Sequence, residues 1–187
     1  PKSLLRHKLA VSELAELSKG TFKNVIDEAD GLDPAKVRRL VLCSGKVYFD
    51  LLEQRRTDGI DDVAIVRLEQ IYPFPADEYV AMLKKYANAR DVVWCQEEPQ
   101  NQGAWYQIRH RLQQGLSSKD TLLYAGRAGA AAPAAGIYQL HVEQQQRLVR
   151  AALVGAPGDD SVRDTKPLSA PKAAKTPSNE GKARKNA

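Results

Sequence analysis

The stretch WCQEEPQNQGAW, from Trp94 to Trp105, places two indoles, a cysteine and two adjacent carboxylates within twelve residues. Paired carboxylates are a common means of general acid–base catalysis. Glu97 and Glu98 are neighbours in sequence, however, and neighbouring side chains on an extended backbone point to opposite sides. The pair therefore does not predict a shared acid–base site. We expect one carboxylate to bond a neighbouring loop or subunit and the other to face water.

The stretch Cys43-Ser44-Gly45-Lys46 is a second candidate, because a small turn that leads into a helix exposes backbone N–H groups that attract anions. The Ser44 hydroxyl and the Lys46 charge would add to such a site. The stretch lacks the earlier glycine and the following Ser or Thr of a phosphate-binding loop. The competing interpretation, which we favour, is that Ser44 caps the helix and Lys46 is solvated.

The histidines and cysteines do not form a recognisable catalytic or metal-binding pattern. His7, His110 and His141 are dispersed, and their spacing matches neither a metal-binding pair nor a Ser–His–Asp arrangement. Cys43 and Cys95 each follow a strand-like run, where a buried free thiol is the ordinary explanation. Two such thiols are consistent with a reducing compartment. We therefore predict no catalytic residue and no metal ligand.

Strand-like and helix-like patterns alternate along most of the chain. Strands are predicted over 38–45, 62–75, 90–98 and 121–127, and helices over 46–59, 76–89, 103–114 and 139–153. Such repeated units predict an α/β fold, a three-layer arrangement with a mostly parallel sheet flanked by helices. Ligands bind such sheets beyond the carboxyl ends of the strands. Both candidate stretches fall there, together with Ala125-Gly126-Arg127.

Three regions are predicted from these patterns. Residues 1–35 read as a linker that contains one short helix over 12–20, with Ser12 as its N-cap. Residues 36–154 form the α/β domain. Residues 155–187 contain no Phe, Tyr, Trp or Ile and read as a disordered Ala/Pro/Lys-rich tail.

The positive charge of the chain is concentrated in this tail. The formal charge of the 187 residues is +5, and residues 155–187 supply seven basic and four acidic side chains. The nearly neutral remainder gives no reason to expect a nucleic-acid partner. No apolar run approaches the roughly 18 residues of a membrane span, so no membrane association is predicted. The first residues, Pro-Lys-Ser, read as those of a cut chain rather than a signal peptide.

Several longer motifs go beyond general patterns. PKSLLRHKLAVSEL, LCSGKVYFDLLEQRR, VAIVRLEQIYPFP, VWCQEEPQNQGAW and YAGR resemble the C-terminal end of the decarboxylating component of 2-oxoglutarate dehydrogenase. The resemblance covers about residues 1–153 in the order of the family, and CSGKVYFDLLEQR and QEEPQNQGAW are its most specific parts. The family ends soon after the position of Leu153, so the tail departs from its pattern.

The resemblance implies a fold and a function. It implies that residues 1–35 leave an upstream pyrimidine-binding domain and that the rest is a transketolase-like C-terminal domain. Enzymes of this family use thiamine diphosphate and Mg²⁺ to decarboxylate 2-oxoglutarate, and they pass the succinyl group to a lipoyl arm of the dihydrolipoyl succinyltransferase component. They are homodimers whose cofactors are held mainly by the upstream domains. No catalytic or cofactor-binding residue is carried over to this segment, which alone is expected to be inactive.

Three hypotheses follow for the segment. In the first it is structural and dimerising, with Glu97, Glu98, Gln102 and Trp105 at a subunit or domain boundary; exposed aromatic side chains on the 103–114 helix would favour this. In the second it is a regulatory module that binds a nucleotide or acyl-CoA through Ser44, Gly45 and Lys46. The third keeps the chemistry but changes the substrate to 2-oxoadipate.

The Ala- and Arg-rich composition favours a bacterial cytoplasm over a mitochondrial matrix.

Overall fold

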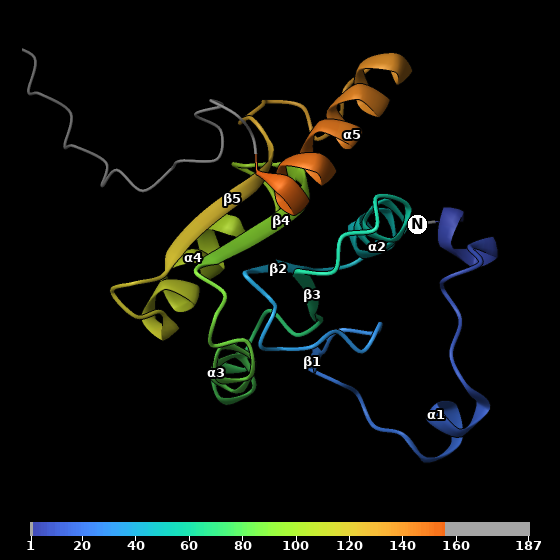
Figure 1. Ribbon diagram of the computed structural model, residues 1–187. Coiled ribbons are helices and arrows are strands. Elements are labelled where there is room, and N and C mark those ends of the chain that lie inside the picture. Colours follow the sequence, from blue (N-terminus) through green and yellow to red (C-terminus); the bar gives the residue numbers. More distant parts are fainter. Residues whose placement is uncertain (1, 156–187) are drawn as a thin grey trace, which may run out of the picture.

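The computed structural model describes residues 2–155 as a central sheet covered by helices, preceded by an N-terminal stretch that loops away from it (Figure 1). The elements in chain order are η1 (Lys2–Arg6), α1 (Leu14–Lys19), β1 (Val25–Ile26), β2 (Arg39–Cys43), α2 (Val47–Thr57), β3 (Val63–Leu68), α3 (Ala76–Lys85), β4 (Asp91–Pro99), α4 (Trp105–Gly115), β5 (Thr121–Arg127) and α5 (Tyr138–Val154).

The sheet confirms the predicted fold class. Its strand order is β1-β3-β2-β4-β5, in which β3, β2, β4 and β5 run parallel and β1 pairs antiparallel with β3. The chain passes from β2 to β3 on one side and then crosses to β4 on the other. The point at which the strand order reverses therefore lies between β2 and β4, where open α/β sheets commonly bind ligands.

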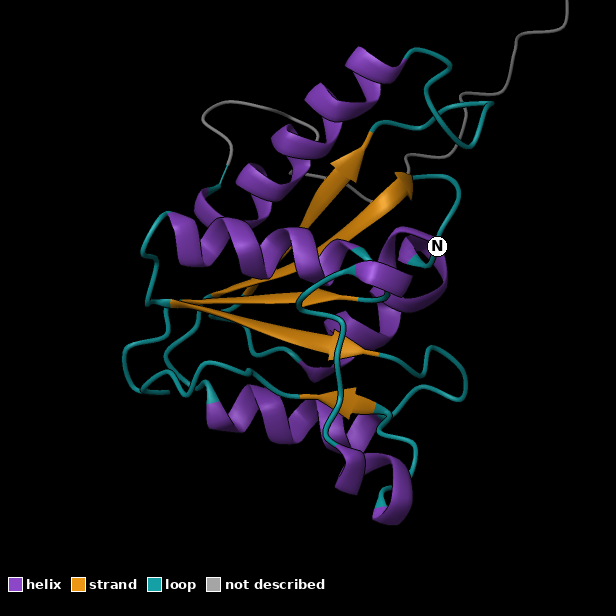
Figure 2. Ribbon diagram, turned by 90° about the vertical axis from the view of Figure 1, so that its right-hand side faces the viewer, coloured by secondary structure: helices purple, strands orange, loops and turns teal. Residues whose placement is uncertain are grey.

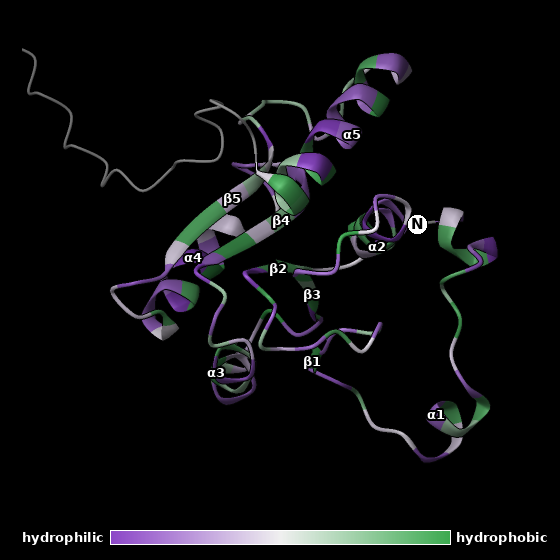
Figure 3. Cartoon of the chain, in the orientation of Figure 1, coloured by the Kyte–Doolittle hydropathy of each residue, from purple (hydrophilic) through white to green (hydrophobic). Residues whose placement is uncertain are grey.

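Helices lie on both sides of the sheet (Figure 2). Side chains of the strands alternate between two cores, one on each side. Leu40, Leu42 and Trp94 point to the side that α3 and α4 cover, whereas Val41 and Cys95 point to the side that α2 and α5 cover. This is the two-residue period of a strand. Because both faces are covered, β2 is buried along its whole length, and hydrophobic residues dominate the strand ribbons in Figure 3.

Some element boundaries differ from those predicted. The second predicted strand ends at Leu68 and not at Pro75. β4 continues to Pro99, because the chain pairs again with Arg127 after a register shift beyond Cys95. Ser12 does not cap the first helix: α1 begins at Leu14, and its N-cap is Glu13, whose N–H donates to a carboxylate oxygen of Glu16 at 3.3 Å.

The first 35 residues contribute more to the sheet than a linker would. β1 extends the sheet beside β3, with Val25 opposite Leu68 and Ile26 opposite Arg67. The division at residue 35 stays a prediction, although these contacts cross it. Of the predicted tail, only Gly155 belongs to the described residues. Within residues 2–155, no helix is both long enough and apolar enough to cross a membrane.

Candidate functional site

The carboxyl ends of three parallel strands meet two helices in a polar group that we call the carboxyl-edge cluster. One residue comes from the end of each of β4 and β5, one follows β2, and three come from α2 and α5. Its members are Glu97, Arg127, Lys46, Asp50, His141 and Gln145. All three stretches that the sequence analysis placed at this edge contribute a member, so the topology brings them together as predicted.

Lys46 lies at the centre of this cluster, immediately before α2. Its Nζ lies 2.7 Å from a carboxylate oxygen of Asp50 and 3.1 Å from one of Glu97. Burial opposes the charged form of Lys46, but the bonds from these two carboxylates outweigh it and raise the pKa. Lys46 therefore stays protonated and is neutralised by two carboxylates. It is suited to hold strands and helix together and unsuited to act as a base.

The capping interpretation of the turn before α2 does not match its geometry. Ser44 does not cap the helix, because the N-cap is Lys46 and no side chain caps this end. Lys46 is not freely solvated either. Gly45 has φ of 72°, a conformation that residues with a Cβ rarely adopt. Phosphate binding at Ser44, Gly45 and Lys46 stays a prediction, and a phosphate would compete with Asp50 and Glu97 for Lys46.

Gln145 and Arg127 extend the cluster from α5 to β5. The Gln145 amide donates to Asp50 at 2.8 Å and to Glu97 at 3.0 Å, and its oxygen accepts from Arg127 at 3.0 Å. Arg127 also lies 3.0 Å from Nδ1 of His141. Because an arginine only donates, Nδ1 of His141 must accept in this contact. The residue Arg127 is 7% exposed, and its Nε has no partner among the described residues.

Beside the cluster, α2 and α5 enclose an open groove of about 580 Å³. Lys46, Asp50, His141 and Gln145 contribute to its wall, together with Tyr138. Charges of both signs line it, which suits a network that joins two helices better than a site for one strongly charged ligand. Residues 2–155 contain no group of three or more His, Cys, Asp or Glu side chains placed to hold a metal ion.

The two cysteines are buried as predicted. Cys43 and Cys95 are paired neighbours on β2 and β4, and both are fully buried. Burial raises the pKa of each thiol. Since the thiolate is the reactive form, neither cysteine is equipped as a nucleophile.

The stretch WCQEEPQNQGAW is organised by Gln96, which lies in a candidate stretch but was assigned no bonding role from the sequence. Gln96 is 3% exposed and accepts from the indole of Trp94 at 2.9 Å and from the backbone of Trp105 at 3.1 Å. Its amide donates to the carbonyls of Glu98 and Pro99 at 3.2 and 3.1 Å. One side chain thus ties the end of β4 to the start of α4. A glutamine between two tryptophans was the available signal, but it is not specific.

The four predicted interface residues, Glu97, Glu98, Gln102 and Trp105, lie in different surroundings. Glu97 is half-buried in the carboxyl-edge cluster and Glu98 is exposed, so they point apart as expected. Gln102 donates to the carbonyl of Ala130 at 3.0 Å. Trp105 is only 2% exposed and packs on Tyr124, with ring centroids 5.1 Å apart. Trp105 does not provide an exposed indole, whereas Tyr106 of the same helix is 46% exposed, and the interface role of these residues stays a prediction.

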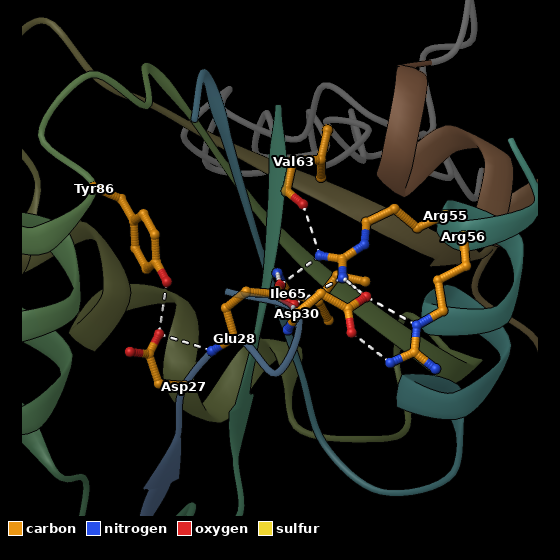
Figure 4. A network of polar contacts seen from close by, with 8 residues as sticks. All are labelled: Asp27, Glu28, Asp30, Arg55, Arg56, Val63, Ile65 and Tyr86. Carbon is orange, nitrogen blue, oxygen red and sulfur yellow. Dashed lines mark hydrogen bonds and ion pairs between the residues drawn. The ribbon is translucent and has the colours of Figure 1, made fainter. Parts of the chain in front are cut away.

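A buried ion-pair network that was not predicted from the sequence lies beside the start of β3 (Figure 4). Arg55 is 1% exposed, and its guanidinium contacts Glu28 at 2.7 Å, Asp30 at 2.6 Å and the carbonyl of Val63 at 3.0 Å. Glu28 also accepts from the backbone N–H of Ile65 at 2.7 Å. The network fastens the segment after β1 to α2 and β3.

Comparison with known proteins agrees with the motifs. The family described as 2-oxoglutarate dehydrogenase C-terminal matches residues 11–153. The 2-oxoglutarate dehydrogenase E1 component of Haemophilus influenzae is 56% identical over 153 residues, which are 82% of this chain and 16% of that protein. The proteins of the same name from Azotobacter vinelandii and Coxiella burnetii are 54% and 53% identical, over 81% and 82% of this chain and 16% and 17% of theirs.

The chain thus spans about one sixth of the length of the relatives it matches. The match includes both candidate stretches and every strand of the sheet. The chain belongs to the 2-oxoglutarate dehydrogenase C-terminal family.

Proposed function

We propose that this chain is the C-terminal segment of a 2-oxoglutarate dehydrogenase E1 component. The whole enzyme would oxidatively decarboxylate 2-oxoglutarate and transfer the succinyl group to the lipoyl arm of the dihydrolipoyl succinyltransferase component. The observation that carries this proposal is the 56% identity to an E1 component over 82% of the chain. The family match over residues 11–153 spans the carboxyl-edge cluster as well as the core.

Within that enzyme, we assign a structural and dimerising role to the segment. Lys46 is already neutralised by Asp50 and Glu97, and both thiols are buried. Lys46 therefore offers bonding between elements and is not activated as a base, and neither thiol is activated as a nucleophile. Such a cluster keeps the carboxyl edge of the sheet rigid, which suits a surface that supports other domains or a second subunit.

Thiamine diphosphate and Mg²⁺ are the cofactors expected of such an enzyme. A hard cation such as Mg²⁺ takes oxygen ligands, and its site with a diphosphate needs several of them together. The acidic side chains of the carboxyl-edge cluster are already bonded to Lys46 and Gln145. These residues do not fit the cofactor. We therefore assign its binding to the upstream part of the enzyme and derive no step of the reaction from this segment.

The full-length enzyme tests the proposed activity. With thiamine diphosphate and Mg²⁺ present, we expect CO₂ release from 2-oxoglutarate, with a higher kcat/KM than from 2-oxoadipate. Preference for 2-oxoadipate would overturn the substrate assignment. Absence of decarboxylation of either acid by a folded, cofactor-loaded protein would overturn the proposed function itself.

The 187-residue chain tests the role of the segment. We expect light scattering to give twice the chain mass as concentration rises and the same sample to show no decarboxylation. Turnover by this chain alone would mean that the segment contains a catalytic site. A monomer at all concentrations would remove the dimerising role.

We place the protein in a bacterial cytoplasm from its composition, which fractionation of the producing cells would check.

A further inference from the structure

The N-terminal arm, which we define as residues 11–23, stands away from the sheet (Figure 1), while residues on both sides of it contact the helices α2 and α3. Every residue of the arm is exposed. Just before it, the ring of His7 lies 5.2 Å from that of Phe49 on α2. Just after it, the amide of Asn24 donates to Glu78 on α3 at 2.8 Å. The arm is therefore a loop anchored at two points and not a frayed end.

The exposed arm carries large apolar side chains. Val11, Leu14, Leu17 and Phe22 are 77%, 78%, 76% and 71% exposed. Single exposed apolar residues are common, but four within thirteen residues between two anchors are an unusual concentration. Hydrophobic residues on α1 are visible in Figure 3, well outside the sheet. None of them contributes to either core.

The short helix in this arm also indicates a missing neighbour. α1 has six residues, and none of them is buried. Isolated helices shorter than about 12 residues are marginal in water, and most helices are stabilised by packing one face. Leu14 and Leu17 are three residues apart and so lie on one face. A second surface covering that face would supply the packing that residues 2–155 do not.

The charge of the arm limits what that surface can be. Its charged residues are Glu13, Glu16, Lys19 and Lys23, which sum to zero, and Lys23 pairs with Glu16 at 2.8 Å. A neutral arm is not drawn to nucleic acid or to an anionic membrane. A neutral arm with four exposed apolar side chains suits an apolar contact, as between two parts of one protein.

We propose that the arm is the docking surface of this segment for the upstream part of the same polypeptide. The inference rests on the proposed function, in which this chain is the end of a much longer one. The matched part is only 16% of the Haemophilus influenzae relative, so about five sixths of such a protein lies outside the described structure. In that longer protein, the apolar face of the arm packs against the upstream part.

Hydrogen exchange on the full-length protein tests this docking. We expect the backbone amides of residues 11–23 to exchange slowly in the wild type, because the face is covered. In the Leu14→Gln, Leu17→Gln double variant, the amides should exchange at least about tenfold faster, since two buried leucines each contribute more than the 1.4 kcal/mol that equals a factor of ten. The matched control is Ala15→Gln, Lys19→Gln, which introduces the same residue twice on the other side of α1.

Each outcome decides the proposal, and none depends on activity. Slow exchange that is lost in the leucine variant and kept in the control supports it. Fast exchange in the wild type overturns it, because the face would be uncovered in the whole protein. Slow exchange unaffected by the leucine variant also overturns it, since the contact would not be apolar. Protection that disappears on dilution to monomers assigns the face to a second copy and overturns it as well.

Discussion

The buried ion pair between Glu28 and Arg55 makes a quantitative prediction about what fastens the first residues to the domain. The side chains of Glu28 and Arg55 are 3% and 2% exposed. Replacing Glu28 by Gln keeps the shape but removes the charge that faces a buried guanidinium. Breaking a buried pair by removing one partner costs about 3–5 kcal/mol. Arg55 would keep Asp30 at 2.6 Å, so we expect the lower end, about 3 kcal/mol.

Urea unfolding of the 187-residue chain, followed by tryptophan fluorescence, measures this loss. A matched control exists in Arg56, which pairs with the same Asp30 but whose side chain is 45% exposed. Exposed pairs contribute about 0–1 kcal/mol, so Arg56→Gln should cost far less than Glu28→Gln. Equal losses in the two variants, or a loss below about 1 kcal/mol for Glu28→Gln, would refute the reasoning that burial makes the pair strong.

Three further predictions concern the turn before α4, the acid limb of stability and the cysteines. Gly103→Ala should lower the free energy of unfolding in urea by about 1–3 kcal/mol, because φ is 57° and a Cβ would lie 2.7 Å from the amide nitrogen of the buried Gln96. Gly136→Ala, with open space around it, should cost little, and equal losses in the two variants would contradict this. The hydrogen bond from Arg56 lowers the pKa of Asp30 to about 2; burial opposes this shift, and Arg55 adds to it. The contribution of Asp30 to the free energy of unfolding is therefore complete above its unfolded pKa of about 4 and is lost as pH falls towards 2. Asp30→Asn should flatten that acid limb in denaturation followed against pH, and an unchanged limb would contradict it. Cys43 and Cys95 should react with a thiol reagent only after unfolding, and labelling of the native chain would show that the sheet opens.

The core of the domain was predictable because its pattern is local. Apolar runs bounded by glycine or proline predicted four strands, and the burial of both faces made those runs continuous. The order of the strands also placed Lys46, Glu97 and Arg127 at one edge, since parallel strands end together. The bonds among them, through Gln145, depend on how α5 packs and have no local signal.

Other features escaped prediction because they join residues far apart in sequence. β1 has two residues, too few for a periodic pattern, and exists because β3 offers an open edge. Glu28 looks like a surface residue until Arg55 is placed beside it, 27 residues later. The capping preferences of Ser12 and Ser44 were overridden. Glu13, whose N–H donates to Glu16, takes the N-cap position of α1, and α2 begins late enough that Lys46, two residues after Ser44, is its N-cap.

The central position of β2 has a consequence for the making of the protein. β2 lies between β3 and β4, and its Arg39 pairs with Asp91 of β4. Lys46, which follows β2, contacts Asp50 and Glu97, and Gln145 of α5 bonds to the same two carboxylates. A ribosome releases the chain from its first residue onward, so the middle of the sheet emerges long before its neighbour β4. Non-local pairing of this kind slows folding. We expect nascent chains that end before α5 to remain sensitive to protease, and acquisition of resistance only after Gln145 has emerged would be the observable sign.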